Sequence, residues 1–134
     1  MERKIVDALV KDAIAAREKS YSPYSNYQVG AALLTKTGKV YTGCNIENAA
    51  YTPSICAERV AIFKAVSEGE TEFEAIAVVT KDGGSPCGVC RQVMSEFMLD
   101  AQVIIADSDG KQHAKMSVSE LLPRAFVPDN LHKK

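Results

Sequence analysis

Three cysteines and a glutamate lie at two places where a loop leads into a predicted helix. Cys56 and Glu58 occur in "ICAER", and Cys87 and Cys90 occur in "SPCGVC". The N-terminus of a helix carries partial positive charge and free N–H groups, which favour thiolate over thiol. Cysteines three residues apart share one face of a helix and can hold the same ion. Because zinc suits thiolates that do no redox chemistry, this pattern predicts a zinc site at these cysteines.

Glu58 is placed to act beside such a site. Three protein ligands leave the fourth position of zinc open for water, whose pKa falls to about 7 in the best-studied sites. A neighbouring carboxylate can take a proton from that water and pass it on. The alternative for Glu58 is a first-turn interaction with the helix dipole, worth under ~1 kcal/mol. The alternative for the metal is a structural four-cysteine site that includes Cys44, although Cys44 lacks a CxxC partner.

Two arginines lie close to the cysteines in sequence, Arg59 three residues after Cys56 and Arg91 directly after Cys90. Three thiolates on Zn²⁺ would leave a net negative charge and weaken its Lewis acidity, so positive charge near the sulfurs is needed. We expect Arg59 to supply it. For Arg91 this role and a solvated helix face explain the sequence equally well.

Composition and charge narrow the function classes. The chain has 134 residues, of which 46% are hydrophobic and 25% charged, typical of one globular domain, and we treat residues 1–134 as that domain. A formal net charge of -1 argues against nucleic-acid binding. No apolar run approaches the roughly 20 residues of a membrane span, and the mixed charges of the N-terminus do not resemble a signal peptide. We therefore expect a cytoplasmic protein without membrane contact, in which metal binding or catalysis explains the cysteines better than disulfides.

The remaining sequence predicts the elements that must position these residues. A helix is expected over 3–19, a β-hairpin over 28–35 and 39–44, and buried strands over 73–80 and 101–107. Further helices are expected over 56–67, from Cys87 onward, and after the Ser117–Glu120 capping box. The helix over 56–67 is predicted to bury Val60, Ile62, Phe63 and Val66. This order predicts an α/β fold, a three-layer α/β/α sandwich with a mixed central sheet, and a partly flexible tail over 127–134.

Longer stretches carry a family resemblance. "CAE" at 56–58 and "PCGVCRQ" at 86–92 resemble the signature of zinc nucleobase deaminases. "PYSNYQVGAALL" (23–34), "GCNIENAAY" (43–51) and "ELLPRAF" (120–126) are similar to the small homotetrameric cytidine deaminases, so the resemblance covers nearly the whole chain. It implies a cytidine deaminase-like fold with about five strands. It also implies hydrolytic deamination of cytidine and 2′-deoxycytidine in pyrimidine salvage, one Zn²⁺ per subunit, and a homotetramer with sites near subunit interfaces.

The same resemblance assigns roles to residues. Cys56, Cys87 and Cys90 would be the zinc ligands and Glu58 the proton shuttle. The implied substrate-binding positions are Asn45 and Glu47 for the ribose hydroxyls, the backbone of Ala57 for the pyrimidine, and Tyr27 beside the substrate. Phe126 would reach a neighbouring subunit's site. The family usually has phenylalanine where Tyr27 stands. The alternatives are a loop that caps itself with Asn45 and Glu47, and a core position for Phe126.

Three other functions fit parts of the sequence. A thiol-disulfide oxidoreductase would use "CGVC", but it leaves Cys56 and Glu58 unexplained. A blasticidin-S-type deaminase shares "PCGxCRQ", whereas "NIEN" and "CAER" favour ordinary cytidine. A nucleic-acid-editing deaminase is disfavoured by the nearly neutral charge and the short chain. His113 and His132 lie in no motif, and we assign them no role.

Overall fold

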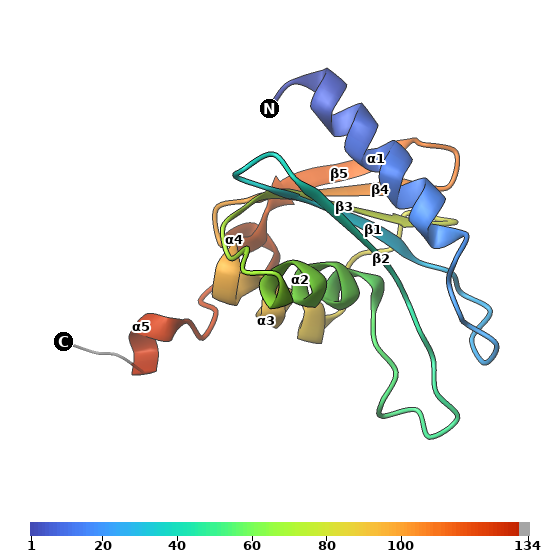
Figure 1. Ribbon diagram of the computed structural model, residues 1–134. Coiled ribbons are helices and arrows are strands. Elements are labelled where there is room, and N and C mark those ends of the chain that lie inside the picture. Colours follow the sequence, from blue (N-terminus) through green and yellow to red (C-terminus); the bar gives the residue numbers. More distant parts are fainter. Residues whose placement is uncertain (132–134) are drawn as a thin grey trace.

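A five-stranded mixed sheet forms the centre of the protein, described by a computed structural model for residues 1–131 (Figure 1). The strands are β1 (Gly30–Thr35), β2 (Val40–Cys44), β3 (Phe73–Thr80), β4 (Gln102–Asp107) and β5 (Gln112–Ser117). They lie in the order β2-β1-β3-β4-β5. β3 and β4 are parallel, and the other neighbouring pairs are antiparallel. The predicted mixed sheet, with a hairpin at one side, is confirmed.

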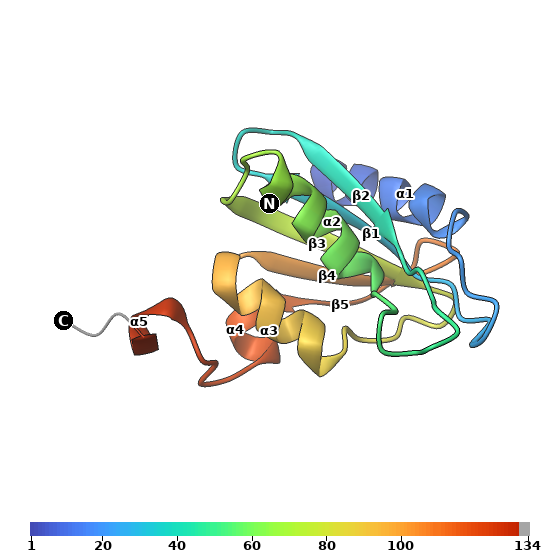
Figure 2. The ribbon, with the colours of Figure 1, turned by 60° about the horizontal axis from the view of Figure 1, so that its bottom comes forward.

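Helices cover both faces of this sheet. α1 (Arg3–Arg17) lies on one face, and α2 (Ala57–Ser67), α3 (Gly88–Phe97) and α4 (Val118–Leu121) lie on the other (Figure 2). The short α5 (Pro128–Leu131) stands away from the sheet. Each face of the sheet has its own cluster of buried side chains. The three-layer α/β/α arrangement is therefore confirmed. Within residues 1–131, no helix has the length and apolar character needed to cross a membrane.

Alternate residues of the central strands pack on opposite faces of the sheet, and their side chains differ in size between the two faces. Ile76 and Val78 pack in the cluster beneath α2 and α3, whereas Ala75 and Ala77 pack beneath α1. Small side chains on the α1 side let that helix lie close to the sheet. At Gly30 the approach leaves no room for a side chain, because a Cβ there would lie 2.0 Å from the carbonyl oxygen of Ala13.

The apolar side predicted for the helix over 56–67 is wrong in part. Ile62 is fully buried, but Phe63 is 45% exposed, and Val60 and Val66 are only half-buried. The residues of α2 that are buried are instead Ala57, Glu58, Ala61, Ile62 and Ala65. Large apolar residues occur around much of this helix, so spacing alone did not distinguish the buried face. The small residues face the sheet because they allow closer packing.

β5 and α5 were not predicted from the sequence pattern. β5 has the sequence "QHAKMS" and lies at the edge of the sheet, where most of its side chains reach solvent, so it lacks an apolar run. The fifth strand was implied only by the family resemblance. α5 occupies part of the tail predicted to be flexible, and residues 132–134 of that tail, with His132, lie outside the described residues.

The close approach of α1 to the sheet predicts that Gly30→Ala lowers the free energy of unfolding by about 2 kcal/mol or more. The added Cβ would meet backbone atoms of Ala13 and Arg17, which cannot move aside cheaply. Gly88→Ala is the matched control, because apart from its chain neighbours and the backbone of its own helix no described heavy atom lies within 4 Å of its Cβ position. Chemical denaturation measures the free energy of unfolding of both variants and of the unchanged protein. Equal stability of the two would contradict the close contact.

Candidate active site

The three predicted metal ligands come together at the N-termini of α2 and α3. The sulfurs of Cys56, Cys87 and Cys90 all lie within 4.8 Å of one another, and those of Cys56 and Cys87 are 3.8 Å apart. Two sulfurs on tetrahedral zinc are separated by about 3.8 Å when each Zn–S bond is near 2.3 Å. Cys56 and Cys87 are the N-cap residues of their helices, and neither side chain caps the backbone. The donor set and its spacing therefore fit one zinc ion.

The electrostatics of these thiols also favour a cation. The contact with Cys90, assisted by Arg59, lowers the pKa of Cys56 to about 5. The same contact and burial raise the pKa of Cys90. These opposite shifts favour the thiolate form at Cys56 and the thiol form, with its proton, at Cys90. A metal dication bound between them would replace that proton, which is the usual coupling of metal binding to deprotonation.

The two arginines have different surroundings. Arg59 donates from its Nη2 to the sulfur of Cys56 at 3.4 Å, which supports the expected compensation of thiolate charge. Arg91 instead donates from Nε to the carbonyl of Pro86 at 2.8 Å and from Nη1 to the carbonyl of Leu121 at 2.9 Å. The guanidinium of Arg91 therefore holds the loop before Cys87 against the end of α4. It is neither a solvated side chain nor a partner of the sulfurs.

Glu58 lies in the first turn of α2 and is only 3% exposed. Burial, reinforced by the charge of Cys56, raises the pKa of its carboxyl group to about 7. A group with a pKa near neutrality can both accept and release a proton under ordinary conditions. Glu58 therefore has the properties expected of a proton shuttle.

A cavity of about 270 Å³ joins these groups to the substrate positions expected from the sequence. Its wall is formed by Ser25, Tyr27, Val29, Asn45, Glu47, Cys56, Glu58, Val78, Thr80, Gly84, Ser85 and Cys87. The cavity is close to the lower end of the volumes that bind small molecules. Ser25, Thr80, Gly84 and Ser85 were not singled out from the sequence. Ser25 lies in "YSPYSNY" and Gly84 and Ser85 lie in "KDGGSP", loops that gave only a turn signal, and Thr80 is the last residue of the buried strand β3.

Asn45 is 9% exposed and holds the backbone of the loop before β1. Its Oδ1 accepts from the N–H of Val29 at 2.9 Å and from the hydroxyl of Ser20. Its Nδ2 donates to the carbonyl of Tyr27 at 2.8 Å. An amide nitrogen has two hydrogens, so Asn45, which lines the cavity, has one more donor.

Glu47 braces the same loop from the other end. Its Oε1 accepts from the N–H groups of Tyr24 at 2.9 Å and Ser25 at 3.1 Å, and its Oε2 accepts from the Ser25 hydroxyl. These bonds, led by the one from the hydroxyl, lower the pKa of Glu47 and keep it ionised. The carboxylate retains lone pairs that can accept from a ligand. Loop bracing and ligand binding are thus compatible for both Asn45 and Glu47.

Two predicted substrate positions do not line the cavity. Ala57 is fully buried and its side chain packs in the core between α2 and the sheet, so the contact of its backbone with the base stays a prediction. Phe126 is 57% exposed, and its carbonyl accepts from Gln92 at 2.9 Å. Its position fits neither the core alternative nor a contact within this cavity, and a role at a neighbouring subunit's site stays a prediction.

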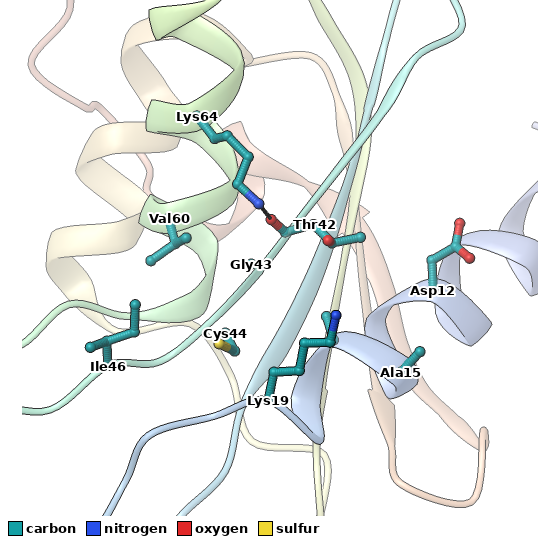
Figure 3. Close-up of a pocket in the computed structure, with 10 residues that line it drawn as sticks. Asp12, Ala15, Lys19, Thr42, Gly43, Cys44, Ile46, Val60 and Lys64 are labelled. Carbon is teal, nitrogen blue, oxygen red and sulfur yellow. Dashed lines mark hydrogen bonds between the residues drawn. The ribbon is translucent and has the colours of Figure 1, made fainter.

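Cys44 lies in a different cavity from the cysteine cluster. That cavity, of about 430 Å³, is formed between α1, β2 and α2, and Lys19 and Lys64 also line it (Figure 3). Burial raises the pKa of the Cys44 thiol. The described structure therefore does not support the four-cysteine alternative. Three thiol ligands, a buried carboxylate and an adjoining cavity are together typical of a zinc-dependent hydrolytic enzyme.

Comparisons with known proteins agree with this class. Residues 3–106 match the family model "Cytidine and deoxycytidylate deaminase zinc-binding region". The cytidine deaminase of Halalkalibacterium halodurans is 52% identical over 127 residues, covering 92% of this chain and 96% of that protein. The crystal structure of the cytidine deaminase from Burkholderia pseudomallei is 48% identical, has a TM-score of 0.86, and covers 94% of this chain and 100% of its own. The chain belongs to the cytidine and deoxycytidylate deaminase zinc-binding family.

Two of the alternatives can now be weighed. A blasticidin-S deaminase of Bacillus cereus is 35% identical over 113 residues, which cover 77% of this chain and 79% of that protein. It is thus a more distant relative than the cytidine deaminases above. The oxidoreductase alternative is at odds with the family and with a third thiol, Cys56, beside the "CGVC" pair.

The three-sulfur cluster predicts one zinc per chain, which metal analysis of the purified protein measures. We expect Cys87→Ala to reduce the zinc content and the melting temperature together, because metal binding contributes directly to folding stability. Cys44→Ala is the matched control and should retain the zinc. Loss of zinc from Cys44→Ala equal to that from Cys87→Ala would contradict a three-cysteine site.

Proposed function

We propose that the protein catalyses the hydrolytic deamination of cytidine and 2′-deoxycytidine, which gives uridine or 2′-deoxyuridine and ammonia. The observation that carries this proposal is one cavity that joins a three-thiol cluster, a buried carboxylate with a pKa near 7, and a loop with polar groups for a sugar. The named relatives at 52% and 48% identity support the same reaction.

In this mechanism Cys56, Cys87 and Cys90 hold zinc, and Glu58 moves the protons. Bound zinc supplies Lewis acidity, which makes water a competent nucleophile near neutral pH. Glu58 takes a proton from the attacking water and gives it to N3 of the cytosine ring as the oxygen bonds to C4. The carboxyl group then passes the second proton of that water to the departing amino group, which leaves as ammonia. Its raised pKa suits both directions of transfer.

Asn45 and Glu47 are proposed to orient the sugar. A ribose hydroxyl can accept from the remaining N–H of Asn45 and donate to the carboxylate of Glu47. Because Glu47 is held ionised, it would repel a phosphate group placed close to it. This charge favours a nucleoside over a nucleotide. The ring of Tyr27 is proposed to lie beside the base, since it forms part of the cavity wall.

We also propose a cytoplasmic homotetramer that acts in pyrimidine salvage. Large apolar side chains on the surface of the single chain support assembly: Phe63, Val89, Phe126 and Tyr51 are 45%, 57%, 57% and 73% exposed. Light scattering coupled to size-exclusion chromatography tests the subunit number. We expect four chains per particle, and a monomer that is fully active would contradict the proposal.

The proposed proton shuttle predicts that Glu58→Gln loses activity by roughly 10²- to 10⁴-fold, the usual contribution of general acid–base catalysis. The amide has the shape of the carboxyl group, so the zinc content and the melting temperature should change little. Glu74→Gln, on the exposed side of β3, is the matched control and should remain active. Full turnover by Glu58→Gln would refute the role.

A substrate panel tests the reaction itself. Ammonia release is measured with cytidine, 2′-deoxycytidine, cytosine, CMP and blasticidin S in parallel. We expect turnover of the two nucleosides and much less of the free base and the nucleotide. Preferred turnover of blasticidin S would favour the antibiotic deaminase instead.

A further inference from the structure

Two loops that meet at the proposed nucleoside cavity are joined by a side-chain contact. The first loop, residues 18–29, supplies Ser25, Tyr27 and Val29 to the cavity wall. The second loop, residues 81–86, supplies Gly84 and Ser85 and leads directly into Cys87. A contact between them affects both the wall and the approach to a metal ligand.

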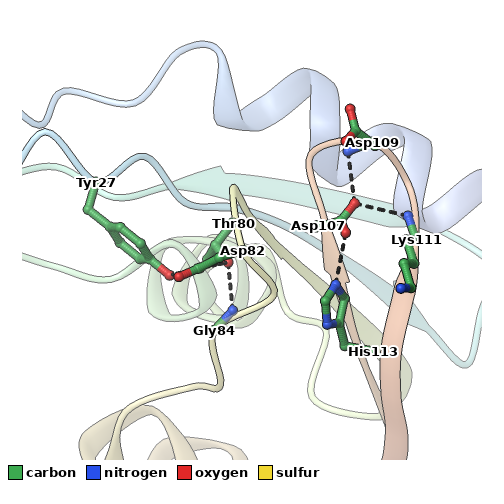
Figure 4. A network of polar contacts seen from close by, with 8 residues as sticks. All are labelled: Tyr27, Thr80, Asp82, Gly84, Asp107, Asp109, Lys111 and His113. Carbon is green, nitrogen blue, oxygen red and sulfur yellow. Dashed lines mark hydrogen bonds and ion pairs between the residues drawn. The ribbon is translucent and has the colours of Figure 1, made fainter.

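The contact is made by Tyr27 and Asp82 (Figure 4). The Tyr27 hydroxyl donates to Oδ1 of Asp82 at 2.8 Å, and the hydroxyl of Thr80 donates to the same oxygen at 3.2 Å. Thr80 Oγ1 in turn accepts from the N–H of Gly84 at 2.7 Å. A continuous set of hydrogen bonds thus runs from the first loop to the backbone of the second.

The packing around Gly84 makes this arrangement specific. A Cβ at Gly84 would lie only 2.5 Å from the Tyr27 hydroxyl oxygen, so the phenol rests directly against the backbone of the second loop. The hydrogen bond from Tyr27 is the main reason that the pKa of Asp82 is lowered, whereas burial raises the pKa of Tyr27. Around neutral pH the donor is therefore a neutral phenol and the acceptor an ionised carboxylate. Hydrogen bonds of this charge-assisted kind are stronger than those between neutral groups.

Other contacts fix the second loop from different directions. The ring of His113 packs against Gly83, where an added Cβ would lie 2.7 Å from it, and that ring is held by Asp107 at 2.8 Å. The carbonyl of Pro86 is held by Arg91. These contacts attach the loop to β5 and α3, whereas the Tyr27–Asp82 contact attaches it to the opposing part of the cavity wall.

We propose that Tyr27 and Asp82 are positioning residues that preorganise the cavity by tying its two loops together. The inference rests on the proposed function, since the cavity is the proposed nucleoside site. An ordered wall in the free protein lowers the entropy cost of binding, because less has to be fixed when the ligand arrives. Asp82 is not among the residues that form the cavity wall, and the chain of hydrogen bonds ends on the backbone of Gly84. We therefore expect the tie to contribute to substrate binding more than to proton transfer.

Kinetics with cytidine test this role. We expect Tyr27→Phe and Asp82→Ala each to raise KM by roughly three- to tenfold, with kcat changed by less than about twofold. Asp82→Asn should raise KM less than Asp82→Ala does, because the amide oxygen still accepts from Tyr27 but lacks the charge of the carboxylate. Tyr41→Phe, which removes a tyrosine hydroxyl beside Glu68 and outside the cavity wall, is the matched control and should have no effect.

The double variant decides whether the two residues act through each other. Tyr27→Phe combined with Asp82→Ala should raise KM no further than either change alone, since both remove the same contact. Independent effects that multiply would overturn the proposal, as would an unchanged KM in Tyr27→Phe. A loss confined to kcat would also overturn it, because the residues would then act on the chemical step.

Hydrogen exchange of the Gly84 amide provides a readout that needs no turnover. We expect exchange in Tyr27→Phe and Asp82→Ala to be about fivefold faster or more, with Tyr41→Phe unchanged. If the unchanged protein failed to deaminate cytidine, the proposed function would be wrong. The exchange rate of the Gly84 amide would still test the contact between Tyr27 and Asp82. Equal exchange in all variants would overturn the tie whatever the enzyme activity.

Discussion

The convergence of three cysteine sulfurs at the start of two helices is the constraint on which the rest of the structure depends. Thiols placed this close share a negative charge and a proton, as the opposite pKa shifts of Cys56 and Cys90 indicate. The arrangement favours a cation between the sulfurs and positive charge around them. The helix N-termini and Arg59 supply the latter.

The N-termini of α2 and α3 stay next to each other only if both helices pack closely against the sheet. Gly43 in β2 allows it for α2, because a Cβ there would lie 2.5 Å from the carbonyl oxygen of Ala57. The buried alanines of α2 serve the same purpose and place Cys56 and Glu58 at the cavity. On the α3 side, Arg91 ties the residue before Cys87 to the end of α4. The packed remainder of α2 and of α3 thus fixes the position of each helix's first turn, which carries the reactive side chains.

Local chemistry was predictable from the sequence, and side-chain contacts between distant segments were not. Cys56, Cys87 and Cys90 could be grouped because their residue type and helix-start context are local properties. Phe63 was misplaced because an apolar side chain at the right spacing does not reveal which face packs on the sheet. The edge strand β5 was missed because exposure removes the alternating pattern on which strand prediction depends.

The contacts made by the loops around the cavity could not be predicted from the sequence either. The sequence suggested sugar contacts for Asn45 and Glu47, yet most of their present bonds go to the backbone of residues 24–29, and the others come from the hydroxyls of Ser20 and Ser25. Asp82 carried no motif, and its contact with Tyr27 joins residues 55 positions apart in the chain. Such pairings depend on the completed fold, so a single sequence offers no local signal for them.

The account depends on a metal held by three sulfurs with one position left for a non-sulfur ligand. X-ray absorption at the zinc edge of the purified protein measures this coordination directly. We predict three sulfur neighbours at about 2.3 Å and one oxygen or nitrogen neighbour near 2.0 Å. Four sulfur neighbours, or zinc without sulfur neighbours, would contradict the account.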